Sequence, residues 1–396
     1  PYTTLFRSNE LNMTYSVPAK EHFLIGLTGN IGTGKSLVRA LLEHQGALGI
    51  DADWMSRLAS MPGAPAFAAI RARFGEEILD AAGEIDRQKL AAMVFTDDRA
   101  LNDLEAILHP EVSRASAVLA ARSPLPVVVI EAIKLLESDL AAQCGSIWVV
   151  TADQQIVFQR LQSLRGMSRA EAQRRLANQT PPEEKIRRAD VVIRNNGDVK
   201  ETWAQAAAAW NELKNLPPLP VEYHHLREKL SLLQPSAENA GRLRDCLRSR
   251  PRSLPALYLQ DALGQPARDG GWYENDALLF QCLARYYLSL KNEKELIAWD
   301  IRHACCTIAM HIPDSGTGRD RLGEKLADIE TFAKFHLCER FLLKADQSAA
   351  GLLREWGYDP QEARNNPTAL RPKAGYNLFT KTCPEVLCLF QGLNGR

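Results

Sequence analysis

Eight residues near the start of the sequence have the types and the spacing that bind a phosphate group. They are Gly29, Asn30, Ile31, Gly32, Thr33, Gly34, Lys35 and Ser36, with glycine, lysine and serine at the fixed positions of a phosphate-binding loop. Glycine lets backbone N–H groups approach a phosphate closely. The Lys35 ammonium can reach the β- and γ-phosphates, and the Ser36 hydroxyl can ligate Mg²⁺. The segment therefore predicts a nucleotide site; the alternative is a glycine-rich turn that only leads into a helix.

The segments around this loop indicate a parallel α/β fold. Residues 23–28 form an apolar run before the loop, and residues 37–42 have the composition of the following helix. Short continuous apolar runs separated by helical stretches are typical of a parallel sheet covered on both faces. Further runs of this kind occur at 47–50, 126–130, 146–150 and 191–193. Helical patterns predict an insertion over 55–122, a polar segment over 154–178 and a last helix over 203–213.

Two carboxylates follow the second expected strand, at Asp51 and Asp53. The carboxyl ends of parallel strands face the ligand crevice, so we expect these residues near the phosphate loop. A carboxylate there can accept a proton from an attacking hydroxyl, or hold Mg²⁺ through water. The alternative is a pair of solvated residues that cap a helix.

The order and spacing of further motifs resemble the dephospho-CoA kinase family. The family's opening motif corresponds to residues 26–36, its D-A-D motif to 51–53 and its L-H-P motif to 108–110. Its D-x-P-L-L-x-E segment corresponds to residues 131–137. Its lid pattern falls on 160–168 with Ala172, Arg175 and Gln179, and its closing run on 185–197. The resemblance covers about residues 23–214.

The resemblance implies a P-loop kinase fold with a helical insertion that binds the acceptor and a lid that closes over the phosphates. It implies transfer of the γ-phosphoryl group of ATP to the 3′-hydroxyl of dephospho-CoA, the last step of coenzyme A synthesis. The implied catalytic residues are Lys35, Asp53 and Arg160, and the implied Mg²⁺ ligand is Ser36. Arg160 and Asn195 join residues 29–36 in the implied ATP site. The implied acceptor site consists of Asp53, His109, Leu135 and Glu137.

Two segments depart from the family pattern. Glu131, Ile133 and Lys134 replace the usual residues of the acceptor segment. Leu164 occupies the usual place of a second lid arginine, and Arg165 lies one residue later. On a helix that shift turns a side chain by about 100°.

These departures leave two other functions open. One is another small-molecule P-loop kinase, with a nucleoside monophosphate or a shikimate-like acceptor. The other is a non-catalytic nucleotide-binding regulatory protein. Two of the implied site residues also have plainer interpretations: His109 as part of a His-Pro helix break, and Asn195 as a turn residue before Asn196-Gly197.

Length and composition are those of a globular protein with two domains. Of the 396 residues, 45% are hydrophobic and 24% are charged, and 48 basic residues balance 48 acidic ones. Zero net charge argues against a broad nucleic-acid surface, and no apolar run reaches the ~20 residues of a membrane-spanning helix. With no signal-peptide pattern, we expect a cytoplasmic protein that binds neither nucleic acid nor membrane. Residues 1–8 resemble translated sequencing-adapter DNA, so we expect 1–12 to be a non-native leader and Met13 the start.

The chain changes character after residue 215. The domain that resembles the kinases spans 13–215, and Pro217, Pro218 and Pro220 make 216–220 a linker that cannot continue a helix. Residues 221–396 are expected to form a separate, mostly α-helical region of unknown function. Its helical patterns cover 224–233, 237–249, 274–290, 293–311, 319–346 and 347–356. A protein-interaction module, a second activity and a gene joined by an assembly error are the three interpretations of this region.

Overall fold

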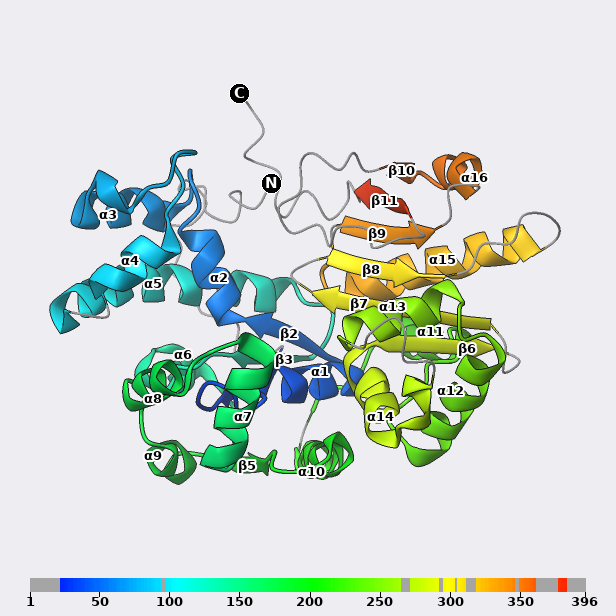
Figure 1. Ribbon diagram of the computed structural model, residues 1–396, viewed down its shortest axis with the longest axis horizontal. Coiled ribbons are helices and arrows are strands. Elements are labelled where there is room, and N and C mark those ends of the chain that lie inside the picture. Colours follow the sequence, from blue (N-terminus) through cyan, green and yellow to red (C-terminus); the bar gives the residue numbers. More distant parts are fainter. Residues whose placement is uncertain are drawn as a thin grey trace.

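The computed structural model describes residues 22–94, 97–214, 216–264, 271–291, 295–302, 305–310, 318–338, 340–345, 349–360 and 377–382. Figure 1 shows two sheets, each with helices around it, and the two parts lie against one another. The expected leader at 1–12 lies outside the described residues.

The first sheet has five parallel strands in the order β2-β3-β1-β4-β5. The strands are β1 (Phe23–Thr28), β2 (Ala47–Asp51), β3 (Val127–Glu131), β4 (Ser146–Thr151) and β5 (Val191–Arg194). Each apolar run expected to be a strand is one, so the predicted parallel α/β fold is confirmed. All five carboxyl ends meet at one edge of the sheet, because the strands are parallel.

Alternate residues of the first sheet enter different cores. Ile25, Leu27 and Trp148 face α1 (Lys35–Gln45) and α10 (Val199–Glu212). Leu24, Ile50 and Val128 belong to a larger core on the other face of the sheet. Burial on both faces explains why these strands are continuous apolar runs rather than alternating ones.

Helices occupy the two segments in which the sequence predicts no strand. The insertion between β2 and β3 contains α2 (Ala52–Ala59), α3 (Pro65–Phe74), the short 3-10 helix η2 (Glu76–Ile78), α4 (Arg87–Val94) and α5 (Asp98–Arg122). The 3-10 helix η3 (Leu135–Glu137) and α6 (Leu140–Gln143) follow β3. The expected lid consists of α7 (Gln154–Arg165) and α8 (Arg169–Ala177), with α9 (Pro182–Arg187) before β5.

The second half contains most of the expected helices but is built on a sheet that the sequence did not predict. Its helices are α11 (Val221–Lys229), α12 (Ala237–Ser249), α13 (Leu254–Ala262), the 3-10 helix η4 (Trp272–Glu274), α14 (Asp276–Arg285), α15 (Gly318–Phe335) and α16 (Ala350–Glu355). Its strands are β6 (Tyr287–Lys291), β7 (Glu295–Arg302), β8 (Cys305–Ala309), β9 (Arg340–Ala345), β10 (Asp359–Pro360) and β11 (Asn377–Thr382). They form one sheet in the order β10-β11-β9-β8-β7-β6, in which only the β8–β9 pair is parallel among the described strands.

The helix expected over 293–311 is therefore wrong, because β7 and β8 occupy it. The helices expected over 274–290 and 319–346 also end earlier, where β6 and β9 follow. In β7, Leu296 and Ala298 enter one core while Ile297 and Trp299 enter the other. With both faces buried, the run loses the alternating pattern that distinguishes a strand from a helix.

The two halves share apolar cores across their boundary. One core contains Leu24 and Leu48 of the first sheet together with Tyr223 and Trp299 of the second half. In the expected linker, Leu219 packs against this core and approaches Gly46 at the end of α1. The Pro-rich segment thus ends the helical pattern as expected, but it is packed rather than free.

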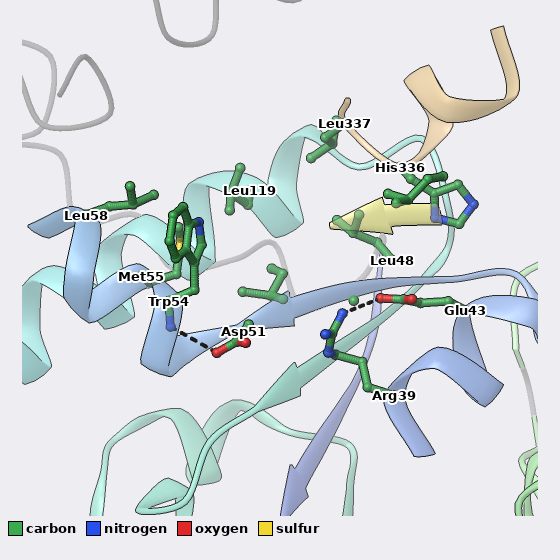
Figure 2. A pocket seen from close by; sticks show the side chains of 13 residues that line it. Arg39, Glu43, Leu48, Asp51, Trp54, Met55, Leu58, Leu119, His336 and Leu337 are labelled. Carbon is green, nitrogen blue, oxygen red and sulfur yellow. Dashed lines mark hydrogen bonds and ion pairs between the residues drawn. The ribbon is translucent and has the colours of Figure 1, made fainter. Parts of the chain in front are cut away.

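A small cavity of about 80 Å³ lies at the boundary between the halves. Figure 2 shows Trp54 and Met55 of α2 on one side and His336 and Leu337, just after α15, on the other. The ion pair between Arg39 and Glu43 of α1 forms another wall. None of the helices in the described part of the chain is long and apolar enough to cross a membrane.

Candidate active site

The phosphate loop joins β1 to α1 in a conformation that favours glycine at Gly29, Gly32 and Gly34. Gly29 and Gly34 have φ values of 148° and 95°, in the region that favours glycine. A Cβ atom would lie 2.2 Å from the Val150 carbonyl oxygen at Gly29 and 2.1 Å from the Asn195 amide nitrogen at Gly34. The loop therefore fits closely between β4 and the residues after β5.

Lys35 is the first residue of α1 and lines the crevice at the carboxyl edge of the sheet. Its Nζ donates a 3.3 Å hydrogen bond to the Asn30 carbonyl oxygen, within the loop. Burial lowers the pKa of the Lys35 ammonium, while the nearby carboxylates of Glu131 and Asp53 oppose that decrease. An anionic ligand that replaced water around this cation would stabilise its charged form.

Ser36 contacts a carboxylate that the sequence did not identify as part of the metal site. Its hydroxyl donates a 2.9 Å hydrogen bond to Glu131 Oε1, at the end of β3. Glu131 Oε2 accepts a 2.8 Å hydrogen bond from Arg39 Nε, which holds the carboxylate in place. The sequence could have identified Glu131 by the argument used for Asp51 and Asp53, because it too is a carboxylate at the carboxyl end of an expected strand.

Asp51 and Asp53 both line the crevice, as the sequence predicts, but they differ in role. The Asp51 carboxylate accepts a 2.9 Å hydrogen bond from the Trp54 backbone N–H and caps α2. Asp53 lies in the first turn of that helix. Desolvation inside the crevice raises the pKa of the Asp53 carboxyl, and the negative charge of Asp51 raises it further, against the opposing effect of Lys35. The raised pKa makes the Asp53 carboxylate a stronger proton acceptor than an ordinary aspartate.

The lid brings positive charge over the loop. Arg160, Leu164 and Arg165 of α7 all line the crevice. Arg165 is close enough to Lys35 for its charge to contribute to the lowered pKa of that lysine, so the one-residue shift does not remove it from the site. Leu164 is 75% exposed.

The end of the lid is fastened to the phosphate loop. Gln179 Oε1 accepts a 2.9 Å hydrogen bond from the Ile31 backbone N–H. The Thr180 backbone carbonyl accepts one of 3.2 Å from the side-chain Nδ2 of Asn30. These bonds connect the segment after α8 to the loop that would hold the phosphates.

Asn195 follows β5, and its side chain is hydrogen-bonded to the phosphate loop. Its Nδ2 donates a 2.8 Å hydrogen bond to the Thr33 carbonyl, and its Oδ1 accepts hydrogen bonds from Thr202 Oγ1 and Arg160 Nη2. It also lines the crevice. The neighbouring Asn196 closes the turn with two hydrogen bonds to Asp153, so the turn interpretation describes Asn196 better than Asn195.

The residues expected to bind the acceptor are not brought together. His109 lies on α5, which continues through Pro110 instead of breaking there, and it does not line the crevice. Leu135 is fully buried, would contact a Cβ atom at Gly26 and does not line the crevice, so its place in the acceptor site stays a prediction. Glu137 accepts a hydrogen bond from Thr180 at the end of the lid.

The residues at 131–134 that differ from the family pattern form specific contacts. Lys134 forms an ion pair with Glu105 of α5, which ties this segment to the helical insertion. The Ile133 carbonyl accepts a 3.0 Å hydrogen bond from Thr28 Oγ1 and one of 2.7 Å from Lys185 Nζ. The segment after β3 is therefore held on both sides, although its residue types differ from the pattern.

The crevice has a volume of about 770 Å³ and is lined by side chains of both charges. Glu131 ends β3 and Asp53 follows β2, whereas the cations come from the loop, the insertion, α7 and α14: Lys35, Arg57, Arg160, Arg165 and Arg285. Ile31, Gly32, Gly34, Lys35, Ser36 and Asn195 also line it, while Gly29, Asn30 and Thr33 face a neighbouring cavity under α8. Such a site can bind a polyphosphate near a carboxylate base.

Ser36 and Glu131 provide oxygen ligands of the kind that Mg²⁺ prefers. Among the described residues, no group of three or more His, Cys, Asp or Glu side chains could hold a metal ion. One hydroxyl and one carboxylate fit a metal that takes its remaining ligands from phosphates and water.

Comparison with known proteins places this half of the chain in a family. The family model described as dephospho-CoA kinase (CoaE) matches residues 23–201. The dephospho-CoA kinase of Geobacter sulfurreducens is 43% identical over 190 residues, which are 47% of this chain and 96% of that protein. That of Geobacter metallireducens is 44% identical over 192 residues, 48% of this chain and 96% of that protein. A solved structure, TT1252 from Thermus thermophilus, covers 50% of this chain and all of its own, with 33% identity and a TM-score of 0.44.

These relatives are matched almost over their full length, whereas each covers only about half of this chain. The opening motif, the carboxylates after β2 and the run that ends at Gly197 all fall within residues 23–201. The chain therefore belongs to the dephospho-CoA kinase family.

Proposed function

We propose that this chain transfers the γ-phosphoryl group of ATP to the 3′-hydroxyl of dephospho-CoA, giving coenzyme A and ADP. Family membership supports the reaction, and one observation supports the place. The phosphate loop with Lys35 and the carboxylate of Asp53 face the same crevice, with Arg160 and Arg165 of the lid above them. A phosphoryl donor and a hydroxyl acceptor could therefore meet between a cationic side and a base.

Catalysis of phosphoryl transfer is mainly positioning and neutralisation of charge. Lys35 and Arg160 stabilise the negative charge that spreads over the transferred phosphoryl group. The carboxylate of Asp53 orients the acceptor hydroxyl and takes its proton as the new P–O bond forms and the bond to ADP breaks. Ser36 and Glu131 would hold Mg²⁺, which would neutralise charge on the ATP phosphates.

Several assignments remain predictions. His109 does not line the crevice. It could bind the acceptor only if part of the acceptor lay outside the crevice, against the helical insertion. An interaction role for residues 221–396 and a cytoplasmic location also stay predictions.

The reaction is tested by measuring ADP release with dephospho-CoA as the acceptor and with AMP and shikimate as controls. We expect ATP- and Mg²⁺-dependent turnover with dephospho-CoA and formation of coenzyme A, identified by mass. Turnover with AMP or shikimate but not with dephospho-CoA would assign the site to another small-molecule kinase. Nucleotide binding without turnover of any acceptor would support the regulatory alternative.

A further inference from the structure

A helix of the second half borders the candidate active site. α14 packs against α1, which begins at Lys35, and against α10, which begins just after the turn at Asn195–Gly197. Figure 1 shows α14 beside these two helices of the first half. The contact is a closed apolar cluster of Phe280 and Ala284 with Leu37, Leu41, Val199 and Ala206. This packing fixes α14 at the edge of the crevice.

Two polar side chains of α14 belong to the lining of the crevice. Gln281 and Arg285 are four residues apart, so they project from one face of the helix. Both line the crevice together with Lys35 and Arg160. Arg285 is exposed, and no carboxylate in the described part of the chain lies within ion-pair distance of its guanidinium group.

Arg285 adds its charge to the side of the crevice that already holds Arg160. Burial lowers the pKa of Arg160, and the positive charge of Arg285 lowers it further. Arg160 Nη1 is buried and has no hydrogen-bond partner among the described residues. Its Nη2 donates a long, 3.4 Å hydrogen bond to Asn195.

Two guanidinium groups that face one space repel each other unless an anion lies between them. The acidic residues of the crevice lie where β2 and β3 end: Asp51 and Glu131 are the last residues of these strands, and Asp53 follows β2. In the sheet, β2 and β3 lie on one side of β1, whereas β4 and β5, which lead into α7 and the turn at Asn195–Gly197, lie on the other. The side formed by α7, α14 and the turn after β5 therefore has a net positive charge and an unsatisfied donor. An anionic ligand would satisfy both.

We propose that Arg285 is a nucleotide-binding residue that the second half contributes to the kinase site, where it binds the phosphates of ATP together with Arg160. This rests on the proposed function, because Lys35 and the phosphate loop define where those phosphates bind. Guanidinium groups bind phosphate oxygens through paired, charge-assisted hydrogen bonds. The second half is then part of the nucleotide site of this chain.

The test measures ATP binding to the full chain by calorimetry, with Mg²⁺ and without an acceptor. We expect Arg285→Ala to weaken ATP binding roughly tenfold, the loss typical of one hydrogen bond to a charged group. Arg285→Lys should retain part of the affinity, and Arg285→Glu should weaken binding more than Arg285→Ala. Adenosine, which lacks phosphates, should bind equally to all variants. Arg354→Ala removes an exposed arginine of α16 that does not line the crevice, and it should bind ATP like the parent protein.

Unchanged ATP affinity in both Arg285→Ala and Arg285→Glu would overturn the proposal. A loss confined to dephospho-CoA, with normal ATP binding, would also overturn it and place Arg285 at the acceptor. Because Arg285 is exposed, circular dichroism and melting curves should match those of the parent protein. Turnover of dephospho-CoA by the parent protein tests the proposed function separately, since binding of ATP alone does not depend on the acceptor.

Discussion

The hydroxyl of Ser36 and the carboxylate of Glu131 are joined by a 2.9 Å hydrogen bond, although 95 residues separate them in the sequence. Glu131 is in turn held by Arg39, which also pairs with Glu43. This links the start of α1 to the end of β3 and defines the proposed Mg²⁺ site.

We predict that Glu131→Gln raises the Mg²⁺ concentration needed for half-maximal activity roughly tenfold, because it removes the charge that the metal would face. The measurement is ADP release across a Mg²⁺ titration. Glu43→Gln is the matched control: it disturbs the same arginine without touching Ser36, so its Mg²⁺ dependence should stay normal. Equal shifts in both variants would show that Arg39 rather than the metal explains the effect.

Lys35→Ala should reduce turnover by about a hundredfold or more, since the cation that neutralises the transferred phosphoryl group is lost. The fold should survive, because the charged form of Lys35 is already disfavoured by burial. Steady-state kinetics and a melting curve measure the two effects. Near-normal turnover in the folded variant would mean that this loop is not the catalytic phosphate site.

The raised pKa of Asp53 predicts an acidic limb in the pH profile. The carboxyl accepts a proton only when ionised, so kcat should fall as the pH decreases through that raised pKa. Asp53→Asn should lower kcat roughly a hundredfold or more and abolish this limb. The profile is measured from ADP release at saturating substrates.

Asp51→Asn provides the companion test. Asparagine can still cap α2, but the negative charge that helps to raise the Asp53 pKa is gone. The acidic limb should therefore move to lower pH while kcat on the plateau stays close to normal. A limb that stays in place would remove Asp53 as the titrating group.

Shared packing predicts that the two halves unfold together. Phe280→Ala should lower the free energy of unfolding by about 3–5 kcal/mol, because it leaves a cavity against Leu37 and Leu41. Leu257, a partly exposed residue of α13, is the control, and its replacement by alanine should cost much less. Urea unfolding followed by circular dichroism gives both values.

For the same reason, a fragment of residues 13–216 should aggregate or melt at a lower temperature than the full chain. It would expose the apolar residues of α1 and β2 that now face the second half. Cooperative unfolding and full kinase activity of that fragment would show that the halves are independent.

Buried His44 should make stability depend on pH. It contacts the ring of Tyr287 across the boundary between the halves, and burial lowers its pKa to about 3. In the unfolded chain the imidazole binds its proton near pH 6.5. The contribution of neutral His44 to the free energy of unfolding is therefore fully present above that pH and declines as the pH falls toward 3. His44→Gln should weaken this decline in unfolding curves measured at several pH values, whereas exposed His225→Gln should not. Identical pH dependence in both variants would contradict the role of His44.

Local patterns in the sequence determined much of the first half. Strand, loop and helix around Lys35 follow directly along the chain, and the strands up to 193 are recognisable as short apolar runs. The catalytic candidates Lys35, Asp53 and Arg160 therefore reach one crevice as predicted. Leu135 shows the limit: a motif position could not reveal that its side chain points into the core beneath Gly26.

Only the tertiary structure decided what distant segments contribute. Glu131 joins Ser36, Gln179 joins Ile31, and Arg285 reaches the crevice from a half that the sequence left without a function. Likewise, the sequence pattern of β7 predicts a helix, whereas the structure has a strand there that is buried against a core on each face. Periodicity and motif spacing describe the residues of one helix, strand or loop. Contacts between elements depend on how those elements pack, and no short stretch of sequence determines that packing.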